Sequence, residues 1–248
     1  MQVREDCWRA EPDYDDAWVH ACAAHARIVF DVGANVGYDA LLILDSPGVE
    51  HIVLVDPNPA ALALAAEHLI RNRLSAKARF VSGLVAAVAG ETRSFWTVGA
   101  GAAGSVYRTH ARTASRRQAS LQVPTITIDS LCDTLGLVPD FIKVDVEGAE
   151  SEVLGGAERC AQHGQTRWLV EMHSNLELPM RDNAARVLAW CASHGLTAWY
   201  LKQHTALRDP DDVAHRGRCH LLLQPAPWPY PEWLRGIPQK SVLPTSFP

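Results

Sequence analysis

The sequence contains no apolar run close to the roughly 20 residues that a membrane-spanning helix needs. Residues 1–6 carry two acids, where a secretory signal has basic residues followed by an apolar core. Basic residues are not in excess either, because 23 Lys and Arg stand against 28 Asp and Glu, for a net charge of −5. These absences predict a cytoplasmic protein with no membrane span and no nucleic-acid partner.

Cysteine patterns typical of disulfide scaffolds or metal fingers are also missing. The six cysteines are scattered, with no C-x-x-C pair, which predicts reduced thiols and no metal site. With 48% hydrophobic residues, a chain of 248 residues is long enough for one α/β domain with additions. We predict a helical N-terminal extension at 1–27, the domain at 28–224, and a proline-rich tail at 225–248 that lies extended over it.

The feature that organises the chain is the stretch from residue 28 to residue 44. A β-branched run is followed by the turn Gly33-Ala-Asn-Val-Gly37 and then by an apolar helix. A strand, a glycine turn and a helix begin the nucleotide-type site of open α/β sheets. The next predicted strand, 51–56, ends at Asp56, about 20 residues further on, where such sites place an acid that accepts ribose hydroxyls.

Two cofactors fit this pattern, and Asp31 favours one of them. NAD enzymes have a third glycine, which this turn lacks, and a carboxylate beside the turn disfavours a pyrophosphate. S-adenosylmethionine carries a sulfonium and an ammonium group, which acids attract. We therefore favour S-adenosylmethionine; an NAD-dependent oxidoreductase of Rossmann type and a non-catalytic cofactor-binding domain remain the alternatives.

The rest of the chain predicts alternating helices and strands, with one exception. We expect a helix capped by Asp129 that ends near Gly136, and a continuous helix over 153–161. Residues 99–120 show neither helical nor strand periodicity and are rich in arginine. They predict a flexible basic loop that closes over an acceptor, which would then be anionic.

Two motifs resemble a known family. Asp31-Val-Gly-Ala-Asn-Val-Gly37 with Asp56-Pro-Asn-Pro59 resembles the first two motifs of S-adenosylmethionine-dependent methyltransferases. Asp140-Phe-Ile-Lys-Val-Asp-Val-Glu-Gly-Ala-Glu150, followed by Val170-Glu-Met-His173, resembles the signature of the FkbM-type methyltransferases. The resemblance covers about residues 28–175. It implies a Rossmann-like class I α/β fold, with a seven-stranded, mostly parallel sheet and helices on both faces.

The resemblance also implies a function and a set of cofactor residues. Family members mostly methylate hydroxyls of natural products, sugars or lipids, which implies an O-methyltransferase with a small-molecule acceptor; the sequence leaves open whether it forms a homo-oligomer. The implied cofactor-binding residues are Asp31, Gly33, Ala34, Asn35, Gly37, Asp56, Pro57, Asn58, Ser82, Gly83 and Leu84.

Candidate catalytic residues follow two strands that should be neighbours. Asp145 ends one strand, and Glu171 and His173 end the next. A hydroxyl is a weak nucleophile, so a base must take its proton, and the imidazole of His173 has an ordinary pKa of about 6.5. Clustered acids would raise the pKa of His173, which favours an acid in that role. A divalent metal held by the carboxylates is the rival use of this cluster, and we predict that no metal is needed.

Overall fold

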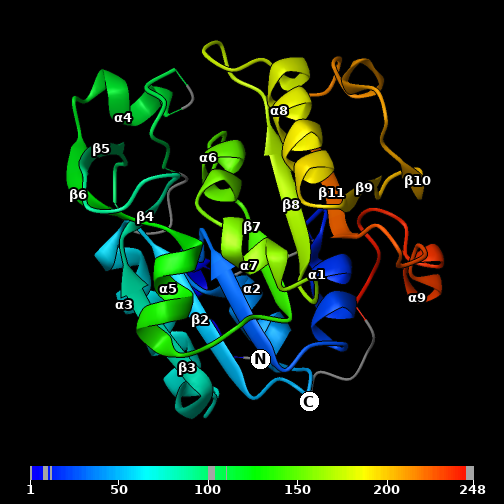
Figure 1. Ribbon diagram of the computed structural model, residues 1–248. Coiled ribbons are helices and arrows are strands. Elements are labelled where there is room, and N and C mark those ends of the chain that lie inside the picture. Colours follow the sequence, from blue (N-terminus) through cyan, green and yellow to red (C-terminus); the bar gives the residue numbers. More distant parts are fainter. Residues whose placement is uncertain (1, 8–10, 12, 100–103, 110, 244–248) are drawn as a thin grey trace.

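A computed structural model describes residues 2–7, 11, 13–99, 104–109 and 111–243. In this part of the chain, one sheet of eight strands runs in the order β10-β9-β11-β8-β7-β1-β2-β3 (Figure 1). Strands β1, β2, β3, β7 and β8 are parallel, and β11 is antiparallel to both β8 and β9. The bounds are β1 Ile28–Val32, β2 His51–Asp56, β3 Ala78–Ser82, β7 Phe141–Val144, β8 Arg167–His173, β9 Leu196–Tyr200, β10 Thr205–Ala206 and β11 Arg218–Pro225. The predicted mostly parallel α/β sheet is confirmed, and the strand beyond the predicted seven is the two-residue β10 at the edge.

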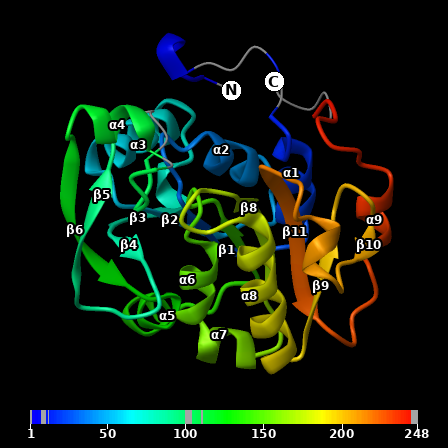
Figure 2. The same ribbon diagram turned by 90° about the horizontal axis from the view of Figure 1, so that it is seen from above.

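Helices cover both faces of the sheet (Figures 1 and 2). Side chains alternate along each strand, so Val29 packs on one face while Phe30 and Val32 pack on the other. The face of Val29 is covered by α1 Asp16–Ala23, α2 Tyr38–Leu44, α3 Pro59–Arg71 and α9 Glu232–Arg235. The opposite face is covered by α5 Ile128–Leu135, α6 Glu150–Gly155, α7 Glu158–Gln162 and α8 Met180–Ser193. The described chain also contains three short 3-10 helices: η1 Glu5–Cys7, η2 Ser75–Lys77 and η3 Pro210–Asp212.

A small second sheet follows β3 and lies beside the main one (Figure 1). Within the described residues, its order is β4 (Leu84–Val85), β6 (Ser120–Ile126) and β5 (Thr92–Trp96). The prediction that 99–120 has no regular structure is wrong for its second half, where α4 spans Arg112–Arg116 and β6 begins. Residues 100–103 and 110 of this segment lie outside the described part of the chain. The strand β6 holds the end of the segment in place by pairing with β5.

Two helix predictions need correction. Helix α5 is capped by Thr127, whose hydroxyl accepts the backbone N–H of Ser130 at 3.0 Å, and the predicted cap, Asp129, lies inside the helix. The predicted helix over 153–161 is two helices, α6 and α7, which separate at Gly156. A Cβ on Gly156 would lie 2.2 Å from the carbonyl oxygen of Ala86, so the chain can pass the second sheet only with glycine there.

The two terminal segments pack on the same face of the domain. Trp18 of α1 and Tyr230 and Leu234 of the tail are buried in one apolar cluster. The tail lies along the domain as expected, but α9 gives it one helical turn, and residues 244–248 are not among those described. All six cysteines are free thiols. None of the described helices is long and apolar enough to cross a membrane. The domain boundaries and the cytoplasmic location stay predictions.

Candidate functional site

A cavity lies at the carboxyl ends of the parallel strands, where the strand order changes direction. The chain passes from β1 to β2 on one side and later places β7 on the other side of β1. Ligands of open α/β sheets bind at such a point. The cavity encloses about 840 Å³ of empty space, including its open mouth. Its lining comes from the turns after β1, β2 and β7, the start of the second sheet, and the segment that contains Gly104 and Val106.

The glycine turn after β1 forms the floor of this cavity. Gly33 has a φ of 85°, and a Cβ on it would lie 1.7 Å from the carbonyl oxygen of Asp145. The turns after β1 and β7 therefore touch, and only glycine allows the contact. Gly37 has a φ of 75° and begins α2, where a Cβ would lie 2.7 Å from that of Ala65.

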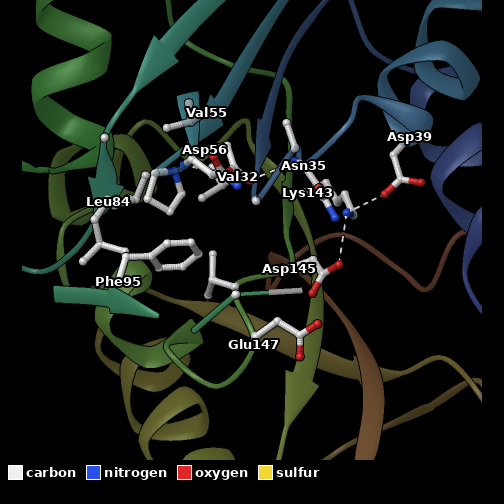
Figure 3. A pocket seen from close by; sticks show the side chains of 18 of the residues that line it. Val32, Asn35, Asp39, Val55, Asp56, Leu84, Phe95, Lys143, Asp145 and Glu147 are labelled. Carbon is white, nitrogen blue, oxygen red and sulfur yellow. Dashed lines mark hydrogen bonds and ion pairs between the residues drawn. The ribbon is translucent and has the colours of Figure 1, made fainter. Parts of the chain in front are cut away.

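Asp56 ends β2 and presents its carboxylate to the cavity (Figure 3). Its Oδ1 accepts the backbone N–H of Asn58 at 2.8 Å, and its Oδ2 accepts that of Asn35 at 2.9 Å. Burial raises the pKa of Asp56, and the two N–H groups oppose that shift. Each carboxylate oxygen has a second lone pair, so the carboxylate can also accept hydrogen bonds from the hydroxyl groups of a ligand.

The cavity has an apolar region and a charged region. Figure 3 shows Leu84 and Phe95 on one side, and Lys143, Asp145 and Glu147 toward the other. The apolar region suits a flat aromatic group, and the charged region suits a polar group. This division matches a nucleoside with a charged side chain.

Lys143 is the centre of the charged region, although only 3% of its side chain is exposed. Its Nζ lies 2.5 Å from Asp39, 3.5 Å from Asp145 and 3.9 Å from Asp31. Burial favours the neutral amine, but the acids, with Asp39 first, raise the pKa of Lys143 well above its usual value. Burial also raises the pKa of both Asp31 and Asp145 to about 7, despite the nearby lysine.

Asp145 adjoins a second group of charges at the end of β8. Single ligand atoms of Asp145, Glu171 and His173 lie within 4.8 Å of one another, which is close enough to surround a metal ion. However, Arg218 lies 2.8 Å from the Oε1 of Glu171, and His173 Nδ1 lies 3.1 Å from Glu150. The acids of this cluster therefore already face cationic partners.

The protonation of Glu171 and His173 follows from these contacts. Burial alone would raise the pKa of Glu171, but the nearby histidines and Arg218 hold it well below its usual range. Burial alone would lower the pKa of His173, but Glu150 and the other acids raise it to about 10. His173 is thus an imidazolium near neutral pH, held by Glu150, and it is not a free base.

The structure brings most of the predicted site residues to the cavity, but not all of them. Those that line it are Gly33, Ala34, Asn35, Asp56, Pro57, Asn58, Gly83, Leu84 and Asp145. Asp31, Gly37 and Ser82 do not line it, and Asp31 is fully buried beneath it as a counter-ion of Lys143. Glu171 and His173 lie behind Asp145, outside the lining. The roles of these residues stay predictions.

Several lining residues were not predicted from the sequence, among them the acidic Asp39 and the aromatic Phe95. Asp39 stands in the first turn of α2, directly after the glycine turn. This position in the sequence was the one local indication that Asp39 lies near the site. Phe95 comes from the second sheet and had no signal, because its approach depends on how β5 and β6 fold back.

Comparisons with known proteins agree with this geometry. The model of the FkbM methyltransferase domain matches residues 31–195. The chain belongs to this family, which implies S-adenosylmethionine as its cofactor. No curated protein matches the sequence.

Solved structures share the fold at low sequence identity. The methyltransferase domain of bacterial CtHen1-C matches with 12% identity over 86% of this chain and 99% of that one, at a TM-score of 0.50. The methyltransferase FkbM from Methylobacillus flagellatus KT matches with 14% identity over 90% of this chain, at a TM-score of 0.46. This chain spans 46% of the length of the Methylobacillus protein. The fold is therefore the class I methyltransferase-like α/β fold, with helices flanking a mixed sheet.

The chemistry of the lining is compatible with S-adenosylmethionine. Asp56 would be the group that accepts hydrogen bonds from ribose hydroxyls, and the apolar side at Leu84 and Phe95 would suit an adenine. Asp39, Asp145 and Glu147 give the opposite region the acids that a cationic amino-acid group and a sulfonium need. The membership of the family sets aside the alternative of an NAD-dependent oxidoreductase.

Proposed function

We propose that the protein transfers a methyl group to a hydroxyl oxygen of a small-molecule acceptor. S-adenosylmethionine supplies the methyl group on a positively charged sulfur. The chain must therefore hold the acceptor oxygen in line with that group and remove its proton. The observation that supports this function is a carboxylate at the charged region of the cavity with a pKa near neutrality.

Asp145 is that carboxylate. Its Oδ2 lies 3.5 Å from Lys143, and its Oδ1 has no hydrogen-bond partner among the described residues. Because its pKa is raised to about 7, the carboxylate is both available as a base and strong enough to take a proton near neutral pH. A neutral amine can attack before it loses a proton, whereas a hydroxyl needs a base, so a poised base favours a hydroxyl over an amine.

His173 and Glu171 position this base. The imidazolium of His173 contributes a positive charge that favours the ionised form of Asp145, and Glu150 fixes the ring. Glu171 lies between His173 and Arg218, at 3.6 Å and 2.8 Å. Since Lys143, His173 and Arg218 already balance acids of the cluster, we propose that the transfer needs no metal ion.

An experiment with labelled cofactor tests the transfer. The protein is incubated with methyl-labelled S-adenosylmethionine and a library of hydroxyl compounds, and the methyl is located in the product by NMR. A methyl ether is the expected product. A methyl group found on nitrogen or carbon would refute O-methylation, and cofactor binding without transfer to any member would favour the alternative of a non-catalytic domain.

A further inference from the structure

A second hollow lies beside the cofactor cavity, where β11 begins. It measures about 810 Å³ including its open mouth. Three side chains with permanent positive charge line it, namely Lys202, Arg216 and Arg218, and two histidines, His215 and His220, line it as well. Among the residues described, no Asp or Glu lines this hollow, although the whole chain carries a net charge of −5.

Much of this positive charge is not neutralised. Arg218 pairs with Glu171 at 2.8 Å and approaches Asp13 at 3.5 Å. Lys202 and Arg216 form no ion pair with any residue that the structure describes, and the Nε of Arg216 is buried without a hydrogen-bond partner there. A half-buried guanidinium with an unsatisfied N–H donor costs free energy unless a ligand accepts a hydrogen bond from it.

The hollow opens at the same edge of the sheet as the cofactor cavity. Strand β11 is antiparallel to β8, so Arg218 at its start lies opposite His173 at the end of β8. Glu171 connects the two sites, because it lies 2.8 Å from Arg218 and within 4.8 Å of Asp145. A molecule that fills the hollow therefore meets Arg218, which Glu171 links to the proposed base.

We propose that the acceptor carries a phosphate or carboxylate group, and that this hollow binds it; this inference rests on the proposed methyl transfer. Guanidinium groups bind such anions through paired N–H donors, and Lys202 adds a point charge. Held there, the anionic group places the rest of the acceptor toward Asp145.

The sequence predicted that the basic loop 99–120 binds an anionic acceptor, whereas we assign anion binding to the hollow at the start of β11. Of the described residues between 99 and 120, Gly104 and Val106 line the cofactor cavity, but no arginine does. Arg108 lies over the ring of Trp96, 4.8 Å from its centroid, and is engaged there. The loop contacts the cofactor cavity through small and apolar residues, and the basic hollow lies on the other side of Asp145.

Binding of simple anions tests the hollow itself. Inorganic phosphate and succinate are titrated calorimetrically at constant ionic strength into the wild type, Arg216→Glu and Lys202→Glu. The control is Arg208→Glu, which makes the same charge change at an exposed residue outside the hollow. We expect each hollow variant to weaken anion binding by about ten- to a hundred-fold, and the control to bind as the wild type does. Equal weakening in the control, or no anion binding by the wild type, would overturn the proposal.

A transfer assay tests whether that anion belongs to the acceptor. Pairs of alcohols that differ only in a phosphate or a carboxylate are compared, with S-adenosylhomocysteine binding and thermal unfolding measured for every variant. We expect methylation of the anionic members, with a KM that rises about ten- to a hundred-fold in Arg216→Gln. Equal transfer to the uncharged members would overturn the inference and leave the proposed function intact. Intact anion binding without methyl transfer to any hydroxyl would instead contradict the proposed O-methyl transfer.

Discussion

The ammonium of Lys143 lies 2.5 Å from the carboxylate of Asp39 and joins β7 to the first turn of α2 beneath the cofactor cavity. Both groups come from segments that line the cavity, so one ion pair fixes the relative position of these segments. The pair is almost completely buried on the lysine side, and Asp31 and Asp145 complete the surroundings of the ammonium. The stability of the domain and the shape of its site are therefore coupled through Lys143.

Replacing Lys143 by methionine should destabilise the fold strongly. Removal of one partner from a buried ion pair leaves charge without compensation and costs roughly 3–5 kcal/mol. The free energy of unfolding in urea measures this loss. The double variant Lys143→Met with Asp39→Leu should recover part of it, because the buried carboxylate is removed as well. A loss below about 1 kcal/mol in the single variant would show that the pair does not hold the segments together.

Asp145→Asn should reduce turnover by about 10²–10⁴-fold, because an amide cannot accept the proton of the acceptor. Its effect on the affinity for S-adenosylhomocysteine should be small. The exposed Asp182→Asn provides a control with the same chemical change. In the wild type, turnover should rise as the pH increases through about 7, since the raised pKa keeps Asp145 protonated below that value. A chelator should leave the rate unchanged; metal-dependent recovery from a chelator would contradict the base mechanism.

Asp56→Ala should weaken binding of S-adenosylhomocysteine by about ten- to a hundred-fold. The substitution removes the charge-assisted hydrogen bonds that we assign to the ribose, each worth about 1.5–3 kcal/mol. It also frees the N–H groups of Asn35 and Asn58. Asp56→Asn keeps an oxygen acceptor and should lose less. Calorimetry measures both, and unchanged affinity in a folded Asp56→Ala protein would remove this residue from the site.

Gly33→Ala and Gly90→Ala separate backbone strain from steric overlap. Their φ angles are 85° and 86°. Alanine is strained in this left-handed region, so each substitution should lower the free energy of unfolding by about 1–2 kcal/mol. Gly90 has no heavy atom within 4 Å of an added Cβ, whereas Gly33 has the carbonyl of Asp145 at 1.7 Å. Only Gly33→Ala should therefore also abolish cofactor binding. Thermal unfolding and calorimetry report the two effects, and similar losses in both variants would mean that the two turns do not need to touch.

His173→Gln should change how stability depends on pH. The pKa of His173 is raised from 6.5 to about 10 in the folded protein. Protonation of His173 therefore adds its full amount to the free energy of unfolding below pH 6.5, and this amount is lost as the pH rises toward 10. The variant lacks this contribution and should lose less stability across that range than the wild type does. Urea unfolding at several pH values measures the difference, with the exposed His163→Gln as the control. Parallel curves for the wild type and His173→Gln would show that the ring is not held as an imidazolium.

The sequence alone determined the parts of the site that are formed by short segments. The order strand, glycine turn, helix set the position of Gly33, and the end of the next strand set that of Asp56, because both depend on local backbone conformation. The alternating strands and helices, with their short connections, also fixed the parallel core. The acids at the ends of β7 and β8 could be expected to meet, because parallel neighbours end at the same edge.

Only the tertiary structure decided which of these side chains reach a ligand. Asp31 stands beside the turn in sequence, but its strand directs the carboxylate away from the cavity and toward Lys143. Asp39, Glu150 and Arg218 come from three separate elements, and they shift the pKa of Lys143, His173 and Glu171, respectively. A pKa depends on burial and on neighbours within a few ångströms, and those neighbours are fixed by packing between segments far apart in the chain.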